Sequence, residues 1–352
     1  RWQSRPSGLE AELDAASLRL QPRRAGSEVS ALTIAWERSS WQSGALQTRG
    51  RLDGLPLAWI DALALEAAQE APNGAARAQG PLARAGLGGD LVFDGRWDLF
   101  LPAQAAQPPR FNLGLQRRSG DLAVQTDGAF DENTTRCQRV QAGVKQAQLQ
   151  LTTDGPRVSA QLRWDSEQFG EASADLTSAL SPPDDRHTAW HWAEAAPVAG
   201  RLQASLPQVG VWSVLAPPGW RVRGSLRAEA VLSGTRADPR FNGSLQADDL
   251  ALRSLVNGIV FRGGELRATL AGERIVIERF RLEGRGGPER GGVLQASGSA
   301  EWRRVLRDGQ TVREPLIELQ ATATRLRAST RADRRLTVTG DLRARLEGRA
   351  LQ

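Results

Sequence analysis

Apolar and polar residues alternate with a period of two along most of the chain. In residues 226–230, leucine and alanine occupy the even positions while arginine and glutamate occupy the odd ones. The same alternation recurs in residues 266–270, in 336–346 and, nearer the start, in 32–36. Successive side chains of a strand point to opposite faces, so this pattern predicts half-buried strands of antiparallel sheet.

Turn-forming residues separate the predicted strands at short intervals. Examples are the segments 118–121 (RSGD) and 153–156 (TDGP). Strands joined by such tight turns indicate a meander of hairpins. Glycines inside strands, at Gly95, Gly298 and Gly340, predict bulges or bends and therefore a curved sheet.

Two segments, 55–68 and 206–216, depart from this alternation and predict short amphipathic helices. Each begins with Leu-Pro, a sequence typical of a helix start, and each contains a tryptophan, Trp59 or Trp212, that we expect to make the helix contacts. Each also follows a similar strand, so the pair resembles an internal repeat.

The repeat suggests a division into two segments of similar style. Residues 1–205 form a repetitive β-trough segment with a short helix near 55–68, and residues 206–352 form a second one that begins with helix 206–216. The long apolar runs of strands buried on both faces are absent. A sheet with one apolar face must curl over it, and long twisted sheets coil or close on themselves. We therefore expect an all-β fold, a long curved antiparallel sheet rolled into an open hydrophobic trough (a β-taco) with one or two short amphipathic helices. Two packed β-sandwiches remain the alternative.

The basic charge does not indicate a nucleic-acid partner. The net charge is +6 and the isoelectric point is near 10.9, but arginine supplies nearly all of the positive charge, and Lys145 is the single lysine. The arginines are spread through every segment and interleaved with acids, so they form no basic stripe. We expect no nucleic-acid binding.

The ends of the sequence suggest a piece of a longer protein. It begins at Arg1 and contains no methionine, so we expect any targeting or anchoring segment to lie outside it. No stretch approaches the ~18 uninterrupted apolar residues that a membrane-spanning helix requires. The chain is therefore expected to be water-exposed.

Candidate chemistry is sparse. Cys137 is the single cysteine, so no internal disulfide can form. The two histidines, His187 and His191, are four residues apart, and on a helix they could bind zinc with Glu194 as a third ligand. Prolines bracket this segment and its periodicity is poor, which favours a loop whose tryptophans cap the sheet, with no metal. We expect no cofactor.

No motif of an enzyme is present. The glycine-rich segment 86–89 does not precede a helix, and no glycine-rich loop ends in the Gly-Lys-Ser/Thr of a P-loop. No serine lies in a Gly-x-Ser-x-Gly elbow, and the carboxylates are not paired for acid–base work. We therefore expect no catalytic residues and no enzymatic activity.

An ordered series of short phrases resembles the TamB family, the inner-membrane-anchored subunit of the translocation and assembly module. The phrases are found in residues 206–212 (LPQVGVW), 223–226 (RGSL), 232–245 (LSGTRADPRFNGSL), 250–253 (LALR), 261–266 (FRGGEL), 282–284, 291–292, 297–300 and 333–340. They cover about a third to a half of the chain. Each phrase is weak alone and their order makes the combination specific.

The resemblance implies a protein of the Gram-negative periplasm, anchored in the inner membrane by an N-terminal helix outside this sequence. Its partner would be an Omp85-type outer-membrane barrel, TamA, contacted through a part of the protein that also lies outside it. The family supports the biogenesis of outer-membrane proteins and autotransporter adhesins, and it is similar to the AsmA-like and bridge-like lipid-transfer proteins. These pass phospholipid between membranes.

Three functions are compatible with the pattern. The first is a phospholipid conduit whose groove is lined by the inward residues Leu226, Leu232, Leu245, Leu266, Leu270, Ile275, Ile277, Leu294, Leu319, Leu336 and Val338. The second is a chaperone-like scaffold that offers a sheet edge to unfolded outer-membrane proteins. The third is a repetitive β adhesin or stalk with a filled core. The pattern alone also allows the inward residues to pack on one another as an ordinary core.

Overall fold

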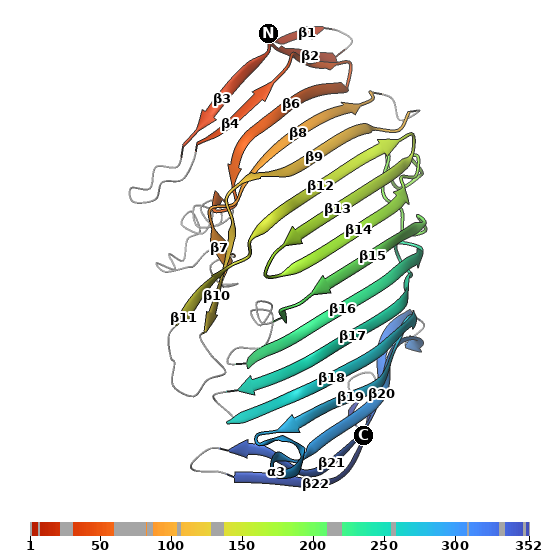
Figure 1. Ribbon diagram of the computed structural model, residues 1–352. Coiled ribbons are helices and arrows are strands. Elements are labelled where there is room, and N and C mark those ends of the chain that lie inside the picture. Colours follow the sequence, from red (N-terminus) through yellow and green to blue (C-terminus); the bar gives the residue numbers. More distant parts are fainter. Residues whose placement is uncertain are drawn as a thin grey trace, which may run out of the picture. The chain divides into compact units, whose positions relative to one another are not determined.

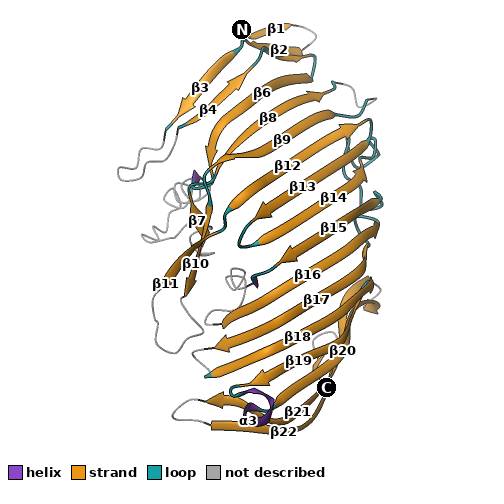
Figure 2. Ribbon diagram, in the orientation of Figure 1, coloured by secondary structure: helices purple, strands orange, loops and turns teal. Residues whose placement is uncertain are grey.

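The computed structural model describes residues 2–5, 8–21, 31–59, 82, 87–103, 107–127, 137–209, 220–254, 258–307, 310–330, 335–347 and 350–351. Its fold is nearly all β, and its long antiparallel sheet is not closed into a barrel (Figures 1 and 2). The predicted all-β class and antiparallel strand pairing are confirmed. No helix in the described part of the chain is long and apolar enough to span a membrane.

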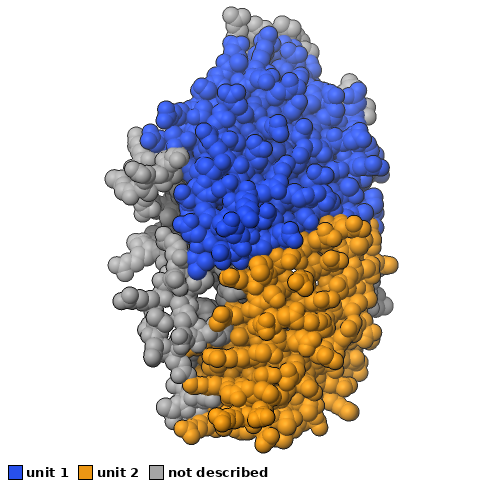
Figure 3. Space-filling model, viewed as in Figure 1, with its two compact units in different colours: residues 1–129, 133–200, 235–237 blue, residues 130–132, 201–234, 238–352 orange. Residues whose placement is uncertain are grey.

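The chain divides into two compact units (Figure 3). Unit 1 comprises residues 1–129, 133–200 and 235–237, and unit 2 comprises residues 130–132, 201–234 and 238–352. Strand β15 (Val198–Leu206) contains residues of both. The two units are described separately below.

Unit 1 is built on antiparallel strands that pair mostly with their neighbours in sequence. Its ladders join β3 to β4, β4 to β6, β6 to β8, β8 to β9, β9 to β12, β12 to β13 and β13 to β14, while β1, β2 and β5 pair in series up to β6. The strands of this sheet are β1 (Trp2–Arg5), β2 (Gly8–Leu13), β3 (Ala16–Leu20), β4 (Leu32–Trp36), β5 (Ser39–Gln42), β6 (Ala45–Pro56), β8 (Val92–Leu101), β9 (Arg110–Ser119), β12 (Val144–Asp154), β13 (Arg157–Ser166) and β14 (Gly170–Ala179).

A smaller sheet in unit 1 consists of β7 (Leu87–Gly89), β10 (Leu122–Asp127) and β11 (Cys137–Gln141). It is tied to the start of β12 by Asp121, whose carboxylate accepts hydrogen bonds from the backbone N–H groups of Gly143 and Val144, each at 2.9 Å. The largest fully buried side chains of the unit are those of Leu91 and Phe169. Its packed core is therefore local and does not extend over the whole sheet.

Unit 2 is a meander in which every strand pairs with the next one in sequence. The ladder runs in the order β16, β17, β18, β19, β20, β21, β22 and β23. These strands are β16 (Trp220–Gly234), β17 (Pro239–Ser254), β18 (Ile259–Gly272), β19 (Arg274–Gly284), β20 (Val293–Arg307), β21 (Gln310–Thr330), β22 (Arg335–Glu347) and β23 (Ala350–Leu351). A short helix, α3 (Gly287–Gly291), connects β19 to β20.

The three glycines that predicted irregularities lie beside bulges, each in the neighbouring strand. Gly95 pairs with Leu52, Gly298 with Ile277 and Gly340 with Ala323, and the register shifts next to each partner. At Gly298 a Cβ atom would lie 2.2 Å from the carbonyl oxygen of Glu318, so only glycine allows the strands to approach this closely. Bulges increase the local twist of a sheet.

The two predicted helices are only partly described. Leu55 and Pro56 are the last residues of β6, and Leu206 is the last residue of β15, so the predicted helix starts are wrong at these positions. Strand β6 continues to this point because Leu55 and Pro56 pair with Phe93 and Val92 of β8. Most of both segments, with Trp212, lies outside the described residues. Trp59 is described, and its indole N–H is buried with no hydrogen-bond partner among the described residues.

Candidate functional site: an uncovered apolar face

The strand register of unit 2 aligns apolar residues of seven strands into rows across one face of the sheet. Residues paired directly across a ladder share a face, and residues two apart on one strand share that face as well. One row is Ala230, Gly243, Leu270, Ile275, Ala300, Ile317 and Leu346. The next is Ala228, Leu245, Ala268, Ile277, Gly298, Leu319 and Ala344.

A third row follows on the same face, made of Leu226, Ala247, Leu266, Phe280, Ala296, Ala321 and Leu342. Every position of the three rows is alanine, glycine, leucine, isoleucine or phenylalanine. We call this surface the apolar face of unit 2. Its rows contain no side chain that can donate or accept a hydrogen bond, so contacts with it are not directional.

A bulge in β19 keeps this face apolar. Ala268 pairs with Ile277 while Arg267 pairs with Arg279, so Glu278 is an extra residue without a partner position in β18. Strict alternation from Ile277 would place Phe280 on the opposite face. The extra residue reverses the parity and returns Phe280 to the apolar side.

Unit 1 has an apolar face of the same kind. One row crosses eight strands and consists of Leu18, Ile34, Leu52, Gly95, Leu115, Leu149, Leu162 and Ala174. Its neighbour consists of Ala16, Trp36, Gly50, Trp97, Leu113, Leu151, Ala160 and Leu176. The ring of Trp97 lies over Gly50, where a Cβ atom would be 2.3 Å from the ring.

Large side chains on both apolar faces remain uncovered. In unit 2, Leu342 is 58% exposed and Ile275 is 43% exposed, and in unit 1 Leu149 is 46% exposed. Most of the fully buried members of these rows are alanines, such as Ala247 and Ala268, which their larger neighbours cover. A contiguous exposed apolar surface of this extent is typical of a binding site and not of an ordinary core.

Seven of the eleven residues predicted to line the groove belong to the three rows of the apolar face of unit 2, and the other four lie beyond these rows. Leu226, Leu245, Leu266, Leu270, Ile275, Ile277 and Leu319 are members of the three rows, and Leu232 continues β16 with the same parity, paired with Phe241. Leu294 pairs with Leu282 and Ala323, Val338 with Leu326, and Leu336 with Ser329 at the end of the face. Their role in lipid binding stays a prediction.

Sequence analysis missed part of the same face. Phe280 was missed because the bulge at Glu278 interrupts the alternation, and no residue type in β19 announces that bulge. Ile317 and Leu342 were missed for a different reason, because the selection of lining residues was incomplete although the alternation was visible. The alanines and glycines of the rows are too small to be recognised as lining residues from the sequence. Only the strand register shows that they lie on this face.

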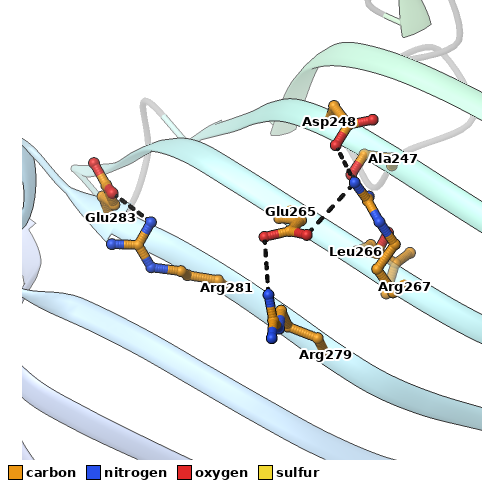
Figure 4. Close-up of polar contacts among 8 residues, drawn as sticks. All are labelled: Ala247, Asp248, Glu265, Leu266, Arg267, Arg279, Arg281 and Glu283. Carbon is orange, nitrogen blue, oxygen red and sulfur yellow. Dashed lines mark hydrogen bonds and ion pairs between the residues drawn. The ribbon is translucent and has the colours of Figure 1, made fainter.

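The opposite face of unit 2 carries charged residues joined by ion pairs (Figure 4). Arg267 Nη2 lies 2.6 Å from Asp248 Oδ1 and 3.5 Å from Glu265 Oε1, and Arg279 Nη1 lies 3.9 Å from Glu265 Oε2. The hydrogen bond from Arg267 to Asp248 raises the pKa of the Arg267 guanidinium further above its ordinary value. This face therefore carries ion-paired side chains where the other face carries apolar ones.

An arginine arrangement recurs on the polar faces of both units. Arg267 Nη1 donates to the carbonyl oxygens of Leu266 and Ala247, and Nη2 donates to Asp248. In unit 1, Arg163 Nη1 donates to the carbonyl oxygens of Leu162 and Ala174, and Nη2 donates to Asp175. In both cases the Leu and Ala whose carbonyls are bound form a cross-strand pair of an apolar row. The guanidinium thus joins two strands directly behind the apolar face.

We expect Arg267→Ala to lower the free energy of unfolding by about 1–2 kcal/mol, because it removes one ion pair and two hydrogen bonds to backbone carbonyls from a part-buried position. Urea denaturation followed by circular dichroism measures the change. Arg279→Ala is the matched control on the next strand, since Arg279 is well exposed and makes one contact at 3.9 Å; it should cost less than about 0.5 kcal/mol. Equal effects of the two variants would contradict the assigned role of Arg267.

The histidine segment is a loop, as the sequence analysis favoured. Residues 182–190 contain no helix, and the loop is closed by an isolated bridge between Ser181 and His191. The structure brings Asp184, and not the predicted Glu194, to the two histidines. Helical spacing had selected Glu194, whereas the turn of the loop places Asp184 beside both rings.

Comparison of the chain with protein-family models, with curated proteins and with solved structures finds no match to any of them.

Proposed function

We propose that the chain is a segment of a periplasmic bridge that carries phospholipid along its apolar faces between the inner and outer membranes. The observation that supports this proposal is the register of unit 2, which aligns uninterrupted rows of uncovered apolar side chains across seven strands. Acyl chains need a surface that is long, apolar and without hydrogen-bonding groups. They gain ~0.8 kcal/mol for each methylene that leaves water.

The apolar face also suits the movement of an acyl chain along it, and not only the binding of that chain. Because the rows repeat alanine, glycine and leucine without a polar group, an acyl chain meets nearly the same surface at each strand. Contacts of this kind are non-directional, so no single position forms a deep energy well. The charged side chains of the opposite face keep the sheet soluble. Lipid tails would therefore bind the apolar face of unit 2 and not the charged one.

The proposed place of the chain, in the periplasm and in the translocation and assembly module, rests on the TamB-like phrases of the sequence. In that setting the full-length protein is anchored in the inner membrane and works with an Omp85-type barrel, TamA, in the translocation and assembly module that supports outer-membrane protein and autotransporter biogenesis. The chain would contribute the lipid path and no enzymatic step. Both contacts would be made by parts of the protein outside this sequence.

A photo-crosslinking amino acid at Leu342 tests the proposal. Leu342 is an exposed member of the apolar face, and its neighbour Arg343 points to the opposite face, so Arg343 is the matched control position. After irradiation in cells, mass spectrometry should find phospholipid adducts at position 342 and none at 343.

Two other outcomes would replace the proposal. Adducts of unfolded outer-membrane proteins at position 342 would support the chaperone-like scaffold. No adduct at 342, together with no phospholipid in an organic extract of the purified protein, would favour the structural adhesin or stalk.

A further inference from the structure

We propose that Asp184, His187 and His191 form a binding site for a divalent transition-metal ion, with zinc as the reference ion. The ligand atoms of the three side chains all lie within 4.8 Å of one another. His187 Nδ1 is 2.9 Å from Asp184 Oδ1, and His191 Nε2 is 3.6 Å from Asp184 Oδ2. Tetrahedral zinc with ligand bonds of ~2.0–2.1 Å separates its ligand atoms by about 3.3 Å, between these two distances.

The protonation of His191 leaves an electron pair directed at the carboxylate. Its Nδ1 faces the carbonyl oxygen of Ala189 at 3.4 Å, and a carbonyl can only accept a hydrogen bond, so Nδ1 carries the proton of the neutral ring. Nε2 then presents a lone pair toward Asp184 Oδ2. In this tautomer His191 Nε2 and Asp184 Oδ2, 3.6 Å apart, can both offer a lone pair to one metal ion. A second ring nitrogen bound to a carbonyl is also the usual outer-shell arrangement of a metal-binding histidine.

The carboxylate of Asp184 is held in place by backbone hydrogen bonds. Asp184 Oδ1 accepts hydrogen bonds from the backbone N–H groups of Arg186 and His187, at 2.9 and 2.8 Å. Its other oxygen, Oδ2, lies 3.6 Å from His191 Nε2.

The loop itself is fixed in place. Ser181 and His191 exchange two backbone hydrogen bonds, at 2.9 and 3.1 Å, and Asp184 and His187 exchange two more. Farther along, Trp192 Nε1 donates to Ser178 Oγ at 2.7 Å, and Arg236 lies over the Trp192 ring at 5.3 Å. The two imidazoles stack at 3.8 Å with an interplanar angle of 15°. The backbone of the loop is therefore ordered before an ion binds, and the stacked rings need to turn to direct one lone pair each at the same ion.

Two imidazoles and one carboxylate suit an ion of borderline softness such as zinc, and they suit magnesium or calcium poorly. Three protein ligands leave at least one coordination position for water. The exposed positions of Asp184 and His187 give the ion direct access from solvent. The site would act as a staple across the loop that joins β14 to β15.

Zinc titration of the full chain by isothermal calorimetry tests the proposal, together with NMR of the side-chain nitrogens of its two histidines. We expect one saturable zinc site, with both histidines shifted together, and no response to magnesium. His191→Ala should weaken zinc at least ~100-fold, beyond the ~10- to 100-fold that loss of an outer-shell partner costs. Circular dichroism checks that the variant is folded.

The controls separate this site from the other candidate ligands. Glu194→Gln and Cys137→Ser should each leave zinc affinity within about twofold of the wild type, since the proposed ligands are Asp184, His187 and His191. The proposal is overturned if wild-type protein shows no saturable zinc binding. It is also overturned if the double variant His187→Ala/His191→Ala binds zinc as tightly as the wild type, or if Cys137→Ser alone abolishes binding.

Discussion

The variant Ile277→Arg is expected to stop lipid movement along the apolar face of unit 2 while the sheet stays folded. Ile277 lies between Ala268 and Gly298 in the second row, so the small neighbours leave space for a longer side chain. An acyl chain that passed this point would strip water from the guanidinium, which costs several kcal/mol for an unpaired charge. A cost of ~3 kcal/mol lowers occupancy at this point more than 100-fold.

Transfer of labelled phospholipid between donor and acceptor vesicles, and the amount of phospholipid that co-purifies with the protein, measure the effect. The control is Val276→Arg, which places the same side chain one residue earlier, on the polar face, beside Thr269 and Ser299. We expect near-normal transfer by the control. Normal transfer by Ile277→Arg, with the arginine shown to lie on the apolar face, would rule out the conduit.

Deleting Ser299 should unfold much of unit 2, whereas deleting Glu278 should cost little. Ser299 lies in the regular part of β20, where the pairs with β21 run without a shift from Val293 to Arg307. Loss of one residue there reverses the parity of half the strand. It would turn Glu301 and Arg303 toward the apolar face and move Trp302 away from it.

Glu278 is the extra residue of the bulge in β19, so its deletion restores strict alternation of Ile277, Phe280 and Leu282. The side-chain interaction that this deletion removes is the hydrogen bond that the hydroxyl of Thr269 donates to the carboxylate of Glu278. We expect a change in the free energy of unfolding below about 1.5 kcal/mol for this deletion. The Ser299 deletion should cost several kcal/mol. Thermal melting and limited proteolysis of both variants test the pair, and similar losses of stability would contradict the register.

The alternation of residue types predicted much of the fold because the chain follows it so regularly. In β18, Leu266, Ala268 and Leu270 face one way and their neighbours face the other, as the period of two requires. Strands with one apolar and one polar face could therefore be predicted without knowing which strands pair. The pairing of consecutive strands followed from tight turns such as Gly155-Pro156 between β12 and β13, whereas the register became visible only in the structure.

The bulges that interrupt the alternation were harder to assign to a strand. Gly298 and Gly340 predicted bulges at nearly the right positions, yet the extra residues belong to the partner strands β19 and β21. A glycine marks where two backbones approach, and sequence alone does not say which of the two carries the bulge. Arg325, in the bulge of β21, has a positive φ of 48°, which its residue type did not suggest.

The histidine cluster shows a second limit. Its third member, Asp184, precedes the histidines by three and seven residues, and Glu194 follows them at the same two offsets, so helical spacing alone did not distinguish the two carboxylates. The loop assembles the cluster through the Ser181–His191 bridge and the turn at Asp184. Long-range backbone contacts of this kind become visible only in the folded chain.

The sequential pairing of β16 to β22 has a consequence for how such a chain folds and grows. Each strand is held by the strands next to it in sequence, so contacts are local and the entropy of closing each loop is small. Folding can begin at one hairpin and propagate to the next, as in repeat proteins. Duplication of a single hairpin would lengthen the sheet by about 10 Å without new packing rules, so gene duplication could set its reach.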